Sequence, residues 1–209
     1  YKLQEESGRA WQTSLTKARL AAGATYENFV VATGGRYMRN EIEVMLEGSG
    51  ASCDLGGGFL LAEKQQVDNR LQVDHAAPEG TSRQTYKGIL DGHAHGVFQG
   101  KTVVHRDAQK TDGNQLSRAL LLSPDAIMDA KPELEIYADD VKCSHGSTIG
   151  KLDAEALFYL RSRGLSEPDA RVLLTQGFVA EICDALEGDS LRPFAQALVT
   201  DALASCTGN

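Results

Sequence analysis

The stretch FVVATGGRYMRNEIEVMLEG, residues 29–48, decides the fold class. It holds two short apolar runs, FVVATGG and EIEVMLEG, and the second begins with apolar side chains that alternate with glutamates. A period of two is typical of a β-strand with one buried face, and Gly34-Gly35 between the runs suits a turn. Runs of similar length recur as far as Ile149, without the apolar period of a helix. The sequence therefore predicts an all-β body.

This body is predicted to cover residues 26–150 and to be either a sandwich or a coil of stacked rungs such as a β-helix. Weak regular spacing favours stacked rungs, although periodicity alone does not separate the two architectures. Turns are also expected where glycine makes a positive φ inexpensive, at Gly56 to Gly58, Asp91-Gly92 and Asp112-Gly113. Residues 1–25 are polar and compatible with a helix, and we interpret them as a lead-in segment.

Residues 151–209 are predicted to form a small helical domain. In LDAEALFYLRSRG, Asp153 is a candidate N-cap and Gly164 suits the position after the helix. Ser166 is a candidate cap for a second helix, which Gly177 would weaken, and LRPFAQALVTDALA is a third helical segment. Five basic residues against nine acidic ones favour a protein-docking surface over a nucleic-acid one.

Charge and composition limit the classes of molecule that the protein is expected to bind. The 209 residues carry 21 Lys and Arg against 29 Asp and Glu, a formal charge of −8 that repels phosphate backbones and anionic lipids. Nucleic acid and membranes are therefore poor partners, and the sequence lacks a signal pattern or a long apolar span. It starts at Tyr1, so we expect a fragment of a longer soluble protein. Its four scattered cysteines favour the reducing cytoplasm.

Common catalytic motifs are missing. The sequence has no phosphate-binding loop, and Gly48-Ser49-Gly50 lacks the third glycine of a dinucleotide loop. It also has no G-x-S-x-G elbow and no H-E-x-x-H pair. We therefore do not expect a self-contained enzyme.

Two groups of residues remain as candidate metal sites. His93 and His95 would project from one face of a strand and, with His75 and His105, could form a cupin-like site. However, alternation in a strand also produces exposed polar pairs without a function.

The second group is Cys143 and His145, which share one face if the strand is extended, with Ser144 on the other. Thiolate and imidazole are ligand types of iron–sulfur chemistry, but a cluster needs about four ligands. The site would therefore need a second chain or be transient. Alternatively, Cys143 packs as a small hydrophobic residue and His145 caps the β body. Asp139 and Asp140 could attract Fe²⁺, or could be solvated turn residues.

The string LEIYADDVKCSHGSTIGKLDAEALFYLRSRG, residues 134–164, resembles the SufB/SufD family of the SUF iron–sulfur cluster assembly machinery. Residues 33–69 and 67–126 resemble the same family, so the likeness covers nearly the whole chain. Cys143-Ser144-His145-Gly146 matches the SufD branch, because SufB has an H-E-A-T-type stretch there. Members are about twice as long, so the likeness is to their C-terminal half.

The resemblance implies a right-handed parallel β-helix followed by a small C-terminal helical domain. It also implies a non-catalytic scaffold that pairs with SufB, docks the SufC ATPase through residues 151–209, and shares a transient iron–sulfur cluster with SufB. By the motif match His145 is the ligand, and Cys143 is a weaker candidate. No cofactor is expected to bind this chain tightly by itself. The alternatives are a purely structural adaptor for SufC and, without SufB, a homodimer.

Overall fold

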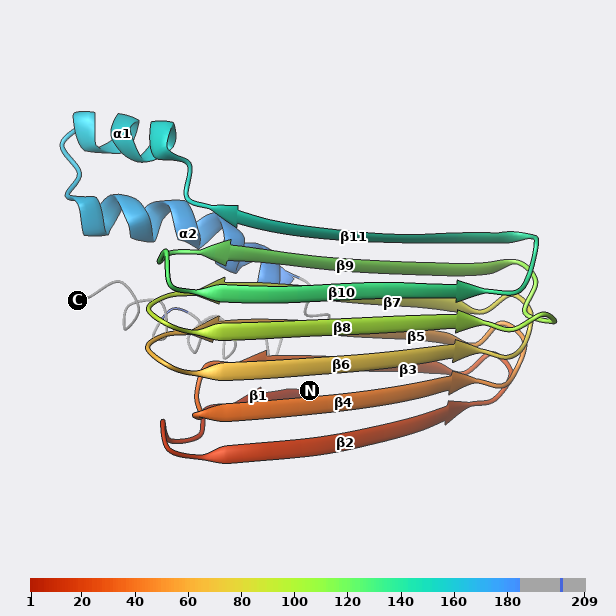
Figure 1. The fold of residues 1–209 in the computed structure, drawn as a ribbon. Coiled ribbons are helices and arrows are strands. Elements are labelled where there is room, and N and C mark those ends of the chain that lie inside the picture. Colours follow the sequence, from red (N-terminus) through yellow and green to blue (C-terminus); the bar gives the residue numbers. More distant parts are fainter. Residues whose placement is uncertain (185–199, 201–209) are drawn as a thin grey trace.

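The chain is a parallel β-solenoid followed by helices. The computed structural model describes residues 1–184 and residue 200. Two parallel sheets face each other, with strand orders β1-β3-β5-β7-β9-β11 and β10-β8-β6-β4-β2 (Figure 1). Successive strands from β2 to β11 alternate between the sheets, so the chain winds through about five turns. The predicted β-helix is therefore confirmed, and the sandwich alternative is excluded.

The strands are mostly ten residues long. Their bounds are β1 Lys2–Gln4, β2 Trp11–Leu20, β3 Thr25–Ala32, β4 Tyr37–Leu46, β5 Ser52–Leu61, β6 Gln66–His75, β7 Thr81–Leu90, β8 His95–Val104, β9 Thr111–Leu121, β10 Ile127–Ile136 and β11 Val141–Lys151.

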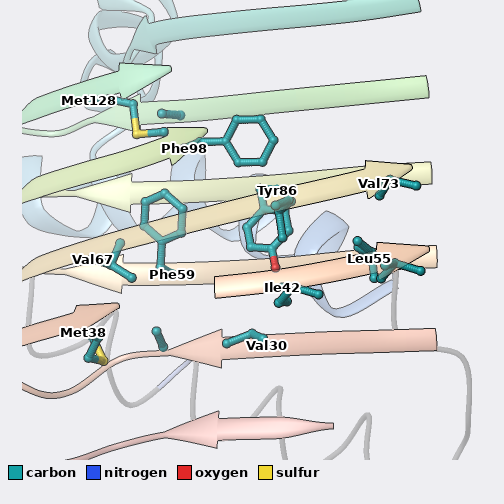
Figure 2. Packing of buried hydrophobic residues seen from close by; sticks show 14 of the residues in the cluster. Val30, Met38, Ile42, Leu55, Phe59, Val67, Val73, Tyr86, Phe98 and Met128 are labelled. Atoms are coloured by element: carbon teal, nitrogen blue, oxygen red, sulfur yellow. The ribbon is translucent and has the colours of Figure 1, made fainter. Parts of the chain in front are cut away.

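The middle rungs stack in a constant register. Tyr37 of β4 pairs with Gln66 of β6, which pairs with His95 of β8, so the repeat here is 29 residues. Within β4 the side chains alternate in burial, and Ile42 is 2% exposed. The inner faces of the two sheets enclose the core, in which Tyr86 and Phe98 pack with ring centroids 5.4 Å apart (Figure 2).

Glycines inside the strands make room for aromatic rings. The turns predicted at Gly56 to Gly58 and at Asp112-Gly113 are wrong, because these residues lie within β5 and β9. A Cβ at Gly57 would be 2.4 Å from Tyr86 Cε1, and one at Gly56 would be 2.5 Å from Phe29 Cδ2. Glycine is required there by packing rather than by chain reversal. Gly92, with φ +60, does occupy a turn as expected.

The interpretation of residues 1–25 as a helix-compatible lead-in is also wrong. Residues 2–4 and 11–20 form β1 and β2, which pair in parallel with β3 and β4. The inner face of this first rung is polar: Ser14 Oγ donates to Asn40 Oδ1 at 3.0 Å, and Lys2 Nζ donates to the same oxygen at 2.8 Å. Polar side chains on both faces hide the apolar alternation that marks the later strands.

Within the described residues, two helices follow the last strand (Figure 1). The helix α1, Ala154–Ser162, starts after Asp153, whose Oδ1 accepts two backbone N–H groups at 2.9 and 3.4 Å. Gly164, with φ +96, lies just beyond the end of α1. The helix α2, Glu167–Asp184, starts after Ser166. Both predicted helix starts are confirmed.

The helix α2 is attached to the solenoid by side chains of both parts. Arg171 Nη1 donates to the Leu122 carbonyl at 3.3 Å, and the Arg118 guanidinium lies 5.7 Å from the centroid of the Phe178 ring. Gly177 does not interrupt α2. The third predicted segment, residues 191–204, lies outside the described residues apart from residue 200.

Candidate functional site

The candidate site lies on β11, the last strand of the solenoid. β11 is at the edge of the six-stranded sheet, next to β9, and β10 is at the corresponding edge of the other sheet, next to β8. In the described part of the chain, neither strand has a neighbour on its other side. In the described structure the outer edges of β10 and β11 are therefore unpaired, and backbone groups along both edges can accept another strand.

Cys143 and His145 share one face of β11, as predicted from their spacing. Cys143 is in register with Gly113 and His145 with Gln115, and both of these β9 residues are buried. Ser144 points to the other face, where its Oγ donates to Asn114 Oδ1 at 2.6 Å. The two candidate ligands thus belong to the inner face of the last rung. His145 is nevertheless exposed, because no further rung covers it in the described structure.

Cys143 is the less available of the two donors. It is half-buried and packs with Val141 against a small apolar cluster of Val104, Ala108 and Ala138. Burial raises the pKa of the Cys143 thiol, and a backbone hydrogen bond with Gly113 opposes this rise only in part. At neutral pH the thiol is protonated and is a weak metal donor, since the thiolate is the ligand form.

Directly beneath His145 is a residue that our sequence analysis did not select. Gln115 is 3% exposed, its Nε2 donates inside the solenoid, and its Oε1 is buried without a hydrogen-bond partner. Only the repeat of the solenoid relates the two, since they are 30 residues apart. Nothing in the local sequence around Gln115 distinguishes it.

Asp139 and Asp140 do not lie beside the imidazole. They occupy the turn between β10 and β11, and both are exposed. The backbone N–H of Asp140 donates to Gln109 Oε1 at 3.0 Å. Because a strand rises about 3.3 Å per residue, Asp140 lies roughly 16 Å along the chain from His145. Their position fits solvated turn residues.

The other four histidines do not converge. His93 precedes β8, so the prediction that it shares a strand face with His95 is wrong. His95 Nε2 lies 2.7 Å from Asp129 Oδ2, whereas His75 Nε2 lies 2.8 Å from Ser82 Oγ. His95 and His75 lie at opposite ends of their paired strands, roughly 30 Å apart at the usual rise per residue.

His105 does not complete a metal site either. Its Nε2 lies 3.6 Å from Asp74 Oδ1. Within the described residues, no group of three or more His, Cys, Asp or Glu side chains could hold a metal ion. The cupin-like alternative therefore has no support in the structure. Among the described helices, neither is long and apolar enough to cross a bilayer.

Comparison with known proteins gives one consistent result. The family described as "SUF system FeS cluster assembly, SufBD core domain" matches residues 1–178. The chain is 37% identical to a SufBD family protein of Synechocystis sp. over 189 residues, which are 90% of this chain and 42% of that protein. It is also 37% identical to Escherichia coli SufD over 173 residues, 83% of this chain and 41% of SufD.

A plant protein is similar to the same degree. Protein ABCI7, chloroplastic, of Arabidopsis thaliana is 37% identical over 198 residues, 93% of this chain and 41% of that protein. The chain therefore spans about two fifths of the length of these curated relatives.

Proposed function

Because the chain belongs to the SufBD core-domain family of the SUF iron–sulfur cluster assembly system, we propose that it is a non-catalytic scaffold subunit. It pairs with SufB and the SufC ATPase, and a nascent cluster is built at its boundary with SufB. The cluster is cargo that passes through the site. The observation that carries the proposal is the exposed His145 on the open last rung, which a neighbouring subunit can reach.

The available ligands suit a shared and temporary site. His145 supplies one accessible imidazole, and Cys143 is a second candidate, which packs in an apolar cluster and must lose its proton to bind iron. Two ligands fall short of the four or so that hold a cluster, so the partner must supply the rest. Imidazole is released from iron when it is protonated, which favours onward transfer of the cluster.

The free edges of β10 and β11 offer a means of pairing. An incoming strand can hydrogen-bond to an exposed sheet edge, and main-chain bonds then supply much of the affinity. SufB pairs there in the complex, and a second copy of this chain can pair in the same way when SufB is absent.

The helical region, residues 151–209, is the proposed docking surface for SufC. The helix α1 has no buried residue, and Phe158 and Tyr159 are 74% and 55% exposed. Exposed aromatic side chains of this kind suit a protein partner. We place the protein in the cytoplasm, which the free thiols of Cys53 and Cys143 support because a reducing compartment keeps thiols unpaired.

The test uses the complex of this protein with SufB and SufC, purified anaerobically. His145→Ala is expected to abolish the visible absorbance of the cluster and to leave the subunit composition unchanged. The matched control is His93→Ala, because His93 is another exposed histidine but lies in a turn away from β11. If His145→Ala retains the absorbance of the parent complex, the chain is a structural adaptor for SufC and the scaffold proposal is wrong.

A further inference from the structure

Gln115 lies beneath His145 and has one unused hydrogen-bonding atom. Its Nε2 donates to Thr102 Oγ1 at 2.7 Å and to the Glu133 carbonyl at 3.2 Å. A carbonyl can only accept, so the bond to Glu133 settles which end of the amide is the nitrogen. The amide oxygen is then Oε1, which is buried and has no partner.

The register places His145 beside Gln115 on the adjacent strand. Residues paired across adjacent strands lie about 4.8 Å apart, and His145 pairs with Gln115 on the inner face. Since the ring is exposed, rotation of its side chain is not opposed by packing. A buried acceptor without a donor is unfavourable, and a neighbouring N–H that reaches it relieves this cost.

We propose that Gln115 is a positioning residue for His145, accepting a hydrogen bond at Oε1 from one ring N–H. A neutral imidazole has one N–H and one lone pair, so this bond selects the tautomer and leaves the other nitrogen free to bind iron. Partners of this kind also orient the ring and increase its basicity. The ligand role of His145 rests on the proposed function, whereas the hydrogen bond itself does not.

The first test detects the hydrogen bond without a cluster. The whole protein is labelled with ¹⁵N-histidine, and the ring N–H of His145 is assigned by its loss in His145→Ala. A ring N–H that water reaches exchanges too quickly to be observed, whereas one bonded to Oε1 is protected. The signal is expected in the parent protein and absent in Gln115→Met. Absence from the parent protein, or persistence in Gln115→Met, would overturn the proposal.

Two further variants separate the acceptor from general damage to the core. Gln115→Glu keeps an oxygen acceptor but loses the same donated bonds as Gln115→Met, so it is expected to retain the signal. Gln84→Met is the matched control, because Gln84 is buried one rung further in and donates to the same Thr102 Oγ1 at 2.8 Å. Gln84→Met is expected to retain the His145 signal. If Gln84→Met also loses the signal, damage to the core explains its loss in Gln115→Met.

The second test asks whether the bond matters to the cluster. In the complex with SufB and SufC, Gln115→Met is expected to weaken retention of the cluster against an iron chelator about 10- to 100-fold. Loss of the hydrogen-bond partner of a metal ligand usually has an effect of this size. Gln84→Met is expected to match the parent complex. If His145→Ala retains its cluster while the ring signal depends on Gln115, the proposed function fails and the positioning role stands. Unchanged retention in Gln115→Met would refute the influence of Gln115 on the ligand.

Discussion

His75 is expected to make the stability of the solenoid depend on pH. Its side chain is fully buried, and burial lowers its pKa from 6.5 to about 4, an effect that the nearby Asp74 carboxylate offsets only partly. Its Nε2 lies 2.8 Å from Ser82 Oγ, and its Nδ1 has no partner. The folded protein therefore holds this imidazole neutral.

The sign and size of the effect follow from the two pKa values. Because the folded-state pKa is the lower one, the unfolded chain binds the proton more readily, and the stability contribution is complete above pH 6.5. It falls as the pH drops from 6.5 towards 4. At about 1.4 kcal/mol per pKa unit, the full loss is roughly 3 kcal/mol, of which roughly 2 kcal/mol is reached by about pH 5.

The assay is urea unfolding followed by circular dichroism at about pH 7.5 and pH 5. The variant His75→Gln retains a polar nitrogen near Ser82 but cannot take up a proton in this pH range. It is expected to lose roughly 2 kcal/mol less than the parent between the two pH values, because the other titrating groups are shared. Equal pH dependence in the parent and in His75→Gln would refute the reasoning.

Two further predictions concern packing and ligand choice. A Cβ at Gly88 would lie 2.1 Å from Cε2 of the buried Phe59, so Gly88→Ala should lower the free energy of unfolding by about 1–3 kcal/mol, measured in urea. Phe59→Leu should lower the free energy of unfolding less in the Gly88→Ala variant than in the parent, because it removes the ring that the new Cβ meets. Gly150→Ala is the control and should be nearly neutral, since Gly150 has open space around it. If the costs of Gly88→Ala and Phe59→Leu are additive, the two side chains do not clash. Cys143→Ala should retain most of the cluster absorbance that His145→Ala loses, because its thiol is protonated and packed against apolar side chains. An equal loss in both would make Cys143 an obligatory ligand.

Local sequence was sufficient for features that depend on a few neighbouring residues. Asp153 caps α1 and Ser166 precedes α2, because capping involves only the next three residues. Cys143 and His145 share a face because side chains alternate along any extended strand. Strand-length alternation likewise predicted a β body, since it reflects burial of one face of each strand.

Only the tertiary structure decided which residues of distant rungs lie next to each other. Gly57 looked like a turn residue, yet it lies in β5 because Tyr86 of β7 fills the space beside it. The polar strands β1 and β2 lacked a local apolar signal, although they pair in parallel with β3 and β4 as the later strands pair with their neighbours. His145 is in register with Gln115 only because the chain returns after 30 residues. The register between two rungs depends on the length of every turn between them. It is therefore a property of the whole solenoid and not of any short segment of sequence.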